Sequence, residues 1–89
     1  MREIDYTKKF RKDLKREVKT DPRVESLLRS VLELLQAGKD LPAKLKDHPL
    51  QGDWISYRDC HLKPDLVLIY KVDDTTITLA RIGSHSEIF

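Results

Sequence analysis

The chain has 89 residues, of which 39% are hydrophobic and 36% charged, and its formal net charge is +2. This length predicts one domain over residues 1–89, and the apolar fraction is too high for a disordered chain. The single cysteine, Cys60, excludes an internal disulfide and a zinc site made of several cysteines. No apolar run approaches the roughly 20 residues needed to cross a bilayer, so we expect a cytoplasmic protein with no membrane partner.

Charge is divided unevenly along the chain. Residues 1–46 hold thirteen Lys and Arg and eight Asp and Glu, a net charge of +5. Residues 47–89 hold four basic and seven acidic residues, a net charge of −3. A basic first half indicates a polyanionic or acidic partner, although a helix face that only contacts solvent explains the same charges equally well.

The N-terminal part predicts a short strand over residues 2–6 and a helix over residues 8–19, with Thr7 as the N-cap. Apolar residues recur at every fourth position of this helix and form one narrow stripe, which is typical of a helix packed on one side. The stripe consists of Phe10, Leu14 and Val18. The basic residues that surround it are Lys8, Lys9, Arg11, Lys12, Lys15 and Arg16.

A second helix is predicted over residues 22–37, since Asp21 and Pro22 are typical of a helix start and Gly38 of a helix end. Its wide apolar face makes it the main core helix. Residues 38–52 are expected to form a loop that contains His48. This loop is longer than most connections in compact domains, and such loops are often functional.

Three strands are predicted after the loop, over residues 54–61, 66–72 and 75–82, and the last seven residues are expected to form a polar tail. The predicted order is βααβββ. The fold class is therefore α+β, with one mainly antiparallel sheet and two N-terminal helices packed on one face. The other face has no predicted helix to cover it and is a natural place for a ligand.

Alternation along the strands assigns the polar side chains to faces. One face of the strand 54–61 is predicted to carry Tyr57, Asp59 and His61. The opposite face is predicted to carry Trp54, Ser56, Arg58 and Cys60. In the last strand, Arg81 is expected on the same face as Ile77 and Leu79.

The histidines and aspartates that follow residue 46 suggest acid–base chemistry. Histidine exchanges protons near neutral pH, and two histidines that flank a phosphodiester can cleave RNA without a metal. A carboxylate beside a histidine orients its ring, and an arginine stabilises the charge that develops on the phosphate. The candidates are His48, His61, His85, Asp59, Asp65 and Arg81. A lone histidine is more often an ordinary surface residue, and a His/Asp zinc or manganese site is a weaker alternative because no HxxxH or HExxH spacing occurs.

The sequence KDHPLQGDWISYRDCHLKPDLVLIYK, followed by RIGSHSEIF, resembles the YafQ-type branch of the RelE toxins of bacterial type II toxin–antitoxin systems. The resemblance extends over the whole chain, and it depends on four motifs in combination. They are HPL from His48, YRDxH from Tyr57 to His61, PD at Pro64 and Asp65, and G-x-H…F from Gly83 to Phe89.

The resemblance implies a RelE-like microbial RNase fold and a ribosome-dependent endoribonuclease that enters the A site and cuts mRNA there without a metal cofactor. It also implies a preference for adenine-rich, lysine-type codons and neutralisation by a cognate antitoxin. His85 matches the general acid, and the matching residues around it are His48, His61, Asp65 and Asp59. Arg81 and Phe89 match positions that contact the scissile phosphate or the mRNA base. The basic helix from Lys8 to Arg16 would then dock on ribosomal RNA.

Three other interpretations remain at this stage. Toxins of the same fold that poison gyrase bind a protein and have no use for the His/Asp set. A degenerate toxin that serves only as a binding module would be expected to have lost His48 or His85, and both are present. A metal-dependent nuclease is the third.

Overall fold

A computed structural model describes residues 1–89. The elements in chain order are β1 (Glu3–Tyr6), α1 (Lys8–Thr20), α2 (Arg23–Gln36), the 3-10 turn η1 (Ala43–Leu45), β2 (His48–Pro49), the 3-10 turn η2 (Gly52–Trp54), β3 (Arg58–Lys63), β4 (Leu66–Val72), β5 (Thr76–Gly83) and α3 (His85–Ile88). The predicted α+β class and the βααβββ order are confirmed, and the structure adds the short elements β2 and α3. No helix is both long and apolar enough to cross a membrane.

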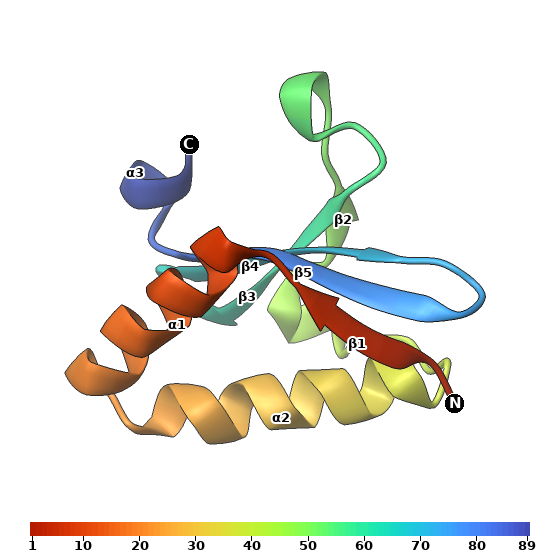
Figure 1. Cartoon of the computed structure of the whole chain (residues 1–89), viewed down its shortest axis with the longest axis horizontal. Coiled ribbons are helices and arrows are strands. Elements are labelled where there is room, and N and C mark those ends of the chain that lie inside the picture. Colours follow the sequence, from red (N-terminus) through yellow and green to blue (C-terminus); the bar gives the residue numbers. More distant parts are fainter.

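The five strands form one sheet in the order β1-β5-β4-β3-β2. Strand β1 runs parallel to β5, and the other three pairs are antiparallel. Helices α1 and α2 lie on one face of the sheet, as predicted (Figure 1). The segment from β2 to η2 and the C-terminal helix α3 rise from the opposite face (Figure 1).

Two helix ends follow the residues that the sequence predicts, Thr7 at the start of α1 and Gly38 at the end of α2. Thr7 Oγ1 accepts a hydrogen bond from a backbone N–H in the first turn of α1 at 3.0 Å. Asp21 Oδ1 accepts from the N–H of Arg23 at 3.0 Å, but α2 begins at Arg23 with Pro22 at the N-cap position, so the predicted start at Pro22 is one residue early. Gly38 ends α2 with a positive φ of 71°, and the next N–H bonds back to Leu34 O at 2.9 Å. This Schellman ending needs a residue that tolerates the left-handed region, which glycine does best.

The main core fills the space between the two helices and the sheet. It buries apolar side chains from both layers, each of which contributes roughly 1.5–3 kcal/mol relative to an exposed position. Its helical members are Phe10, Val24, Leu28, Val31 and Leu35, and its strand members are Cys60, Leu62, Leu66, Leu68, Tyr70, Ile77, Leu79 and Ile82. Large buried residues on α2 agree with its predicted role as the main core helix.

The opposite face carries a second, smaller apolar cluster. Val67, Ile69 and Ala80 are buried there. The side chains that cover them are Leu50, Trp54, Tyr57 and Ile88. The segment around η2 and helix α3 thus cover the apolar part of this face. The polar side chains of the face lie beside this covered part.

The predicted strand over residues 54–61 starts too early. Strand β3 begins at Arg58, because the chain turns at Ser56, whose φ is +80°. Trp54 belongs to η2, and its ring lies edge-on to Tyr57 with a centroid distance of 5.3 Å. The prediction that Trp54 and Tyr57 face opposite sides is therefore wrong. The prediction that Asp59 and His61 share one face is confirmed, because they pair with Ile69 and Val67, which lie on the same face of β4.

A β-bulge moves Arg81 to the other face of the sheet. Tyr70 pairs with Leu79, but the preceding residue of β4, Ile69, pairs with Arg81, which leaves Ala80 as the extra residue. Residues directly opposite each other project from the same face. Arg81 therefore shares the face of Ile69, and the prediction that it lies with Ile77 and Leu79 is wrong. Bulges commonly re-aim a side chain in this way.

Candidate active site

The polar residues of the site form a row across four strands on the face opposite α1 and α2. His48 in β2 pairs with Asp59 in β3, Asp59 with Ile69 in β4, and Ile69 with Arg81 in β5. His61 lies two residues beyond Asp59 and pairs with Val67. Adjacent strands are about 4.8 Å apart, so long side chains that project from the same face of neighbouring strands can contact each other. The predicted site residues are thus brought together by strand register.

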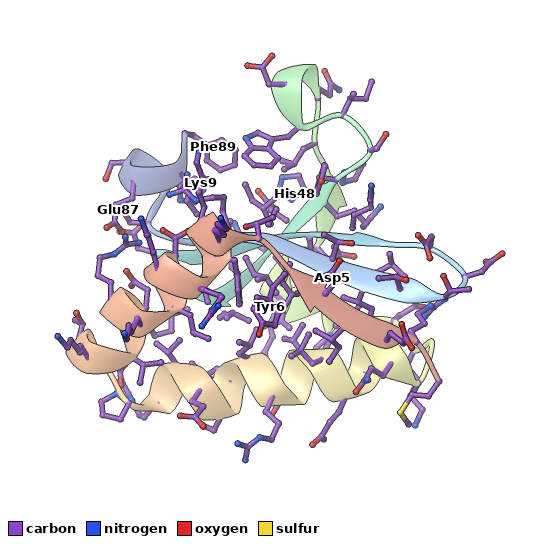
Figure 2. The ribbon with its side chains drawn as sticks, in the orientation of Figure 1. Asp5, Tyr6, Lys9, His48, Glu87 and Phe89 are labelled. Atoms are coloured by element: carbon purple, nitrogen blue, oxygen red, sulfur yellow. The ribbon has the colours of Figure 1, made fainter.

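His48 is held with one ring nitrogen facing the protein. Its Nδ1 lies 2.8 Å from the carbonyl oxygen of Lys46 and 3.1 Å from Asp59 Oδ1. Both neighbours are hydrogen-bond acceptors, so Nδ1 carries the proton and the neutral ring has its lone pair on Nε2. Lys46 adopts the left-handed region with φ 52°, which turns its carbonyl toward the ring. The side chain of His48 remains 51% exposed, and it projects on the same side of the sheet as Phe89 (Figure 2).

Asp59 is the buried carboxylate at the centre of the site. Its residue is 2% exposed, and Oδ1 has no hydrogen-bond donor. Burial raises the pKa of this carboxyl, and the nearby His48, His61 and His85 rings counteract part of that effect. A buried acceptor without a donor destabilises the folded protein. Because Asp59 lies beside Nδ1 of His48, its carboxylate can stabilise a positive charge on the His48 ring.

His61 and His85 come together from β3 and α3. Their ring centroids lie 5.2 Å apart, and Nδ1 of His85 lies 3.6 Å from Asp65 Oδ1. Asp65 also faces the backbone N–H of His85 at 3.5 Å. The Phe89 ring lies 5.9 Å from the His85 ring and is 56% exposed. These four side chains form the second half of the site, on the α3 side.

Helix α3 is fixed by its own first turn and by α1. Ser84 and Glu87 form a capping box, with Ser84 Oγ accepting from the Glu87 N–H at 3.3 Å. Arg16 of α1 contacts Glu87 with an Nε–Oε2 distance of 3.1 Å. The S-x-x-E pattern at residues 84–87 is the sequence signal for this start. The expectation of a polar tail overlooked it.

Arg81 is paired with a buried aspartate of α1. Its Nε donates to Asp13 Oδ2 at 2.6 Å and its Nη2 to Asp13 Oδ1 at 3.2 Å. Asp13 is 3% exposed. Asp13 was not among the predicted site residues. The available signal was its position three residues after Phe10, where a helix presents the same face.

The basic face of α1 is mostly free. Five of its six predicted basic residues are exposed and make no ion pair, namely Lys8, Lys9, Arg11, Lys12 and Lys15. Beside them runs a groove with an apolar lining of Tyr6, Phe10, Leu14 and Val18. Arg16 differs, because it pairs with Asp13, Glu17 and Glu87. Arg16 thus makes ion pairs within the molecule, and its expected place on the docking surface stays a prediction.

Asp47 anchors the segment that leads into His48. Its carboxylate accepts from Arg58 Nε at 3.1 Å and from the hydroxyl of Tyr70 at 2.5 Å. Tyr70 is buried, and its pKa is raised by that burial and by the bond to Asp47. The contacts of Asp47 with Arg58 and Tyr70 join segments far apart in the chain, so the sequence alone did not indicate them.

No group of three or more His, Cys, Asp or Glu side chains is arranged to hold a metal ion. The residues of the site pair with one another and with backbone atoms, as described above. What they offer is two exposed imidazole rings, a buried carboxylate and a guanidinium on one face. That set is suited to acid–base cleavage of a phosphodiester.

Comparison with known proteins agrees with this geometry. The sequence of "mRNA interferase toxin YafQ" of Escherichia coli K12 is 40% identical over 88 residues, which cover 99% of this chain and 96% of that protein. The E. coli toxin in the DinJ–YafQ complex has a TM-score of 0.85 at 39% identity, covering 100% of this chain and 99% of that one. A metal-bound toxin from Helicobacter pylori has a TM-score of 0.90 at 46% identity over the whole of both chains.

The fold is thus that of the RelE-like toxins. The sequence model of one family, described as the bacterial toxin YafQ of type II toxin–antitoxin systems, matches residues 2–89. The chain belongs to this YafQ toxin family, as the sequence resemblance predicted.

Proposed function

We propose that this toxin is an mRNA interferase, an endoribonuclease that cuts mRNA in the ribosomal A site and is neutralised by a cognate antitoxin. The family and the name of the E. coli relative support the activity, and the DinJ–YafQ complex supports an antitoxin partner. Residues 1–89 act as one toxin domain in this proposal. A translated mRNA substrate implies a cytoplasmic site of action, and adenine-rich, lysine-type codons are the expected targets.

The orientation of His48 is the observation that carries the mechanism. Because Nδ1 faces the Lys46 carbonyl and Asp59, Nε2 is the free acceptor. His48 accordingly takes the proton of the ribose 2′-OH, whose oxygen attacks the phosphorus. The bond from phosphorus to the 5′-oxygen breaks, and His85 gives a proton to that leaving oxygen. The products are a 2′,3′-cyclic phosphate and a 5′-hydroxyl end.

The remaining site residues have supporting roles in this proposal. Asp59 stabilises the imidazolium that His48 becomes, and Asp65 orients His85. Arg81 neutralises negative charge on the phosphate. This electrostatic stabilisation is strongest where water is excluded from the site. His61 lies against the His85 ring and contacts the phosphate beside it. The exposed Phe89 ring stacks on an mRNA base.

Ribosomal RNA supplies most of the affinity. The exposed basic face of α1 docks on its phosphates, and each neutralised phosphate adds salt-dependent affinity. The half of the chain that carries the histidines is acidic, with a net charge of −3, and it repels free RNA. Cleavage that depends on the ribosome follows from this division of charge.

The test is primer extension on mRNA in a purified translation system, combined with two variants and two substrates. Loss of the base in His48→Gln should slow cleavage by roughly 10²–10⁴-fold, as should loss of the acid in His85→Gln. A substrate with sulfur in place of the leaving 5′-oxygen needs no general acid. It should restore cleavage to His85→Gln and leave His48→Gln slow.

If the sulfur substrate restores cleavage to His48→Gln and not to His85→Gln, His48 is the general acid and His85 the general base. No cleavage by the folded, ribosome-bound parent protein would refute the nuclease proposal and favour a toxin that acts by binding alone.

A further inference from the structure

The guanidinium of Arg81 is held along one edge only. Its Nε and Nη2 bind the two carboxylate oxygens of Asp13 at 2.6 and 3.2 Å. A guanidinium has five N–H donors in a rigid fork, so this pair uses two of them. The opposite edge, made by Nη1 and the second hydrogen of Nη2, has the spacing that binds two oxygens of a phosphate.

Asp13 is itself a fixed anchor. It lies in the middle of α1, is 3% exposed, and its Oδ2 also accepts from the N–H of Ile82 at 3.2 Å. Arg16 Nη1 lies 3.3 Å from the other oxygen. Burial opposes ionisation of Asp13, but the bonds from Arg81 and Ile82 outweigh it and the pKa is lowered. The carboxylate therefore stays charged and immobile at neutral pH.

The bulge at Ala80 and the aspartate act on the same side chain. The bulge places Arg81 in the row of His48 and Asp59, and from there its side chain reaches Asp13 of α1. A free arginine there would keep many rotamers, and it would lose that freedom when it bound a phosphate. The ion pair with Asp13 restricts the Arg81 side chain when the protein folds. The conformational entropy is therefore already lost before the phosphate binds and does not oppose catalysis.

We propose that Asp13 is a positioning residue for RNA cleavage, which fixes the Arg81 guanidinium so that its free edge faces the scissile phosphate. This inference rests on the proposed function. A purely structural role is the competing explanation, because the bond to the Ile82 N–H also ties α1 to β5. The two explanations differ in which step of the reaction they affect.

Asp13→Asn is the variant that tests the inference, because it keeps the size of the side chain and removes its charge. The amide can accept with one oxygen only, whereas Arg81 donates to both oxygens of Asp13. In either orientation of the amide, Arg81 therefore loses one of its two acceptors. We expect the maximal single-turnover rate on ribosome-bound mRNA to fall at least tenfold. The toxin concentration that gives half of that rate should change less than twofold.

Glu17→Gln is the matched control on the same helix. Glu17 also pairs with an arginine, Arg16, at 2.9 Å, but it has no contact with Arg81. Its maximal rate should stay within twofold of the parent rate. An equal loss in Asp13→Asn and Glu17→Gln would show that any weakening of α1 slows cleavage, and it would overturn the inference.

A double variant separates positioning from folding. In Arg81→Gln the guanidinium is gone, so adding Asp13→Asn should leave the cleavage rate unchanged. The double variant also replaces the ion pair by two neutral groups, so it remains informative if Asp13→Asn alone unfolds. A further loss by the same factor in the Arg81→Gln background would overturn the inference. Equal cleavage by the parent and Asp13→Asn would refute this inference alone, whereas an inactive parent would refute the proposed function and this inference with it.

Discussion

The two buried aspartates of this toxin have opposite surroundings. Asp13 and Asp59 are 3% and 2% exposed, so both carboxylates are removed from water to the same extent. Asp13 receives bonds from Arg81 and from the Ile82 N–H, and its pKa is lowered. Asp59 keeps an oxygen with no donor, and burial raises its pKa.

The different surroundings of the two carboxylates suit them to different tasks, Asp13 to stability and Asp59 to reactivity. A buried charge with a full set of partners is fixed, whereas a buried charge with an open oxygen can respond to a proton that moves nearby. Asp13 lies between α1 and β5 and links the helix to the strand through its bonds with Arg81 and Ile82. Asp59 stands beside the ring of His48, with 3.1 Å between Oδ1 and Nδ1. Asp59, the less stabilised of the two carboxylates, is thus the one that lies beside the proposed general base.

Replacement of Asp59 is expected to have the largest effect. Asp59→Asn should slow cleavage about 10²-fold, near the lower limit for loss of acid–base assistance, because the Lys46 carbonyl still holds the His48 ring. The same variant should be more stable than the parent at pH 7, by about 1 kcal/mol, since the amide removes a buried carboxylate that lacks a donor. Single-turnover cleavage and urea unfolding measure the two effects.

Asp53→Asn is the control for this experiment, because Asp53 is exposed in η2 and has no partner in the site. Neither its cleavage nor its stability should change. If Asp59→Asn loses both activity and stability, Asp59 stabilises the fold and the comparison fails.

The pH dependence of stability should distinguish the two aspartates in sign. The pKa of Asp13 is lowered, so its stabilising effect is present above the unfolded pKa of about 3.8 and is lost as the pH falls through the lower folded value. The pKa of Asp59 is raised, so its contribution is favourable below about 3.8 and is lost as the pH rises through the folded value.

Urea unfolding of the parent, Asp13→Asn and Asp59→Asn between pH 3 and pH 7 measures these contributions. At pH 7, Asp13→Asn should be less stable than the parent, by roughly 3 kcal/mol, because Arg81 loses its charged partner. Asp59→Asn should lie above the parent at pH 7. As the pH falls, the Asp59→Asn curve should approach the parent first. Two difference curves of the same sign would contradict the assignment of the two environments.

Much of the fold was predictable because it depends on local signals. Thr7, Asp21 and Gly38 mark helix ends by their own side-chain and backbone properties, and the apolar run over residues 66–72 is typical of a buried strand. The elements that were missed are short or depend on distant partners. Strand β2 has only two residues, too few for any periodicity, and it exists because His48 pairs with Asp59.

The site shows the same division. Its residue types and their grouping after residue 46 were readable, and the resemblance to the toxin family identified the same set. The face of Arg81 was not readable, because the bulge at Ala80 arises from the pairing of β4 with β5. Asp13 was not predicted as a site residue, since nothing in the helix itself shows that an arginine 68 positions later would pair with it.

A third carboxylate, Asp47, gives the smallest and most specific test of the comparison. It resembles Asp13 in being paired, with Arg58 Nε at 3.1 Å and the Tyr70 hydroxyl at 2.5 Å, but its side chain is 24% exposed. Tyr70→Phe removes one of the two partners and leaves the ring in place. The free energy of unfolding should fall by about 1 kcal/mol, the usual contribution of one hydrogen bond. Cleavage should slow only severalfold, because Asp47 adjoins His48 but Arg58 still holds it.

Tyr6→Phe is the matched control, since Tyr6 is 51% exposed and its hydroxyl has no hydrogen bond within the protein. Its stability should not change. A loss of activity in Tyr70→Phe as large as that of Asp59→Asn, with no loss of stability, would give Asp47 a direct part in the chemistry. Reactivity would then not be confined to the carboxylate that lacks a donor, because a well-paired carboxylate would share it.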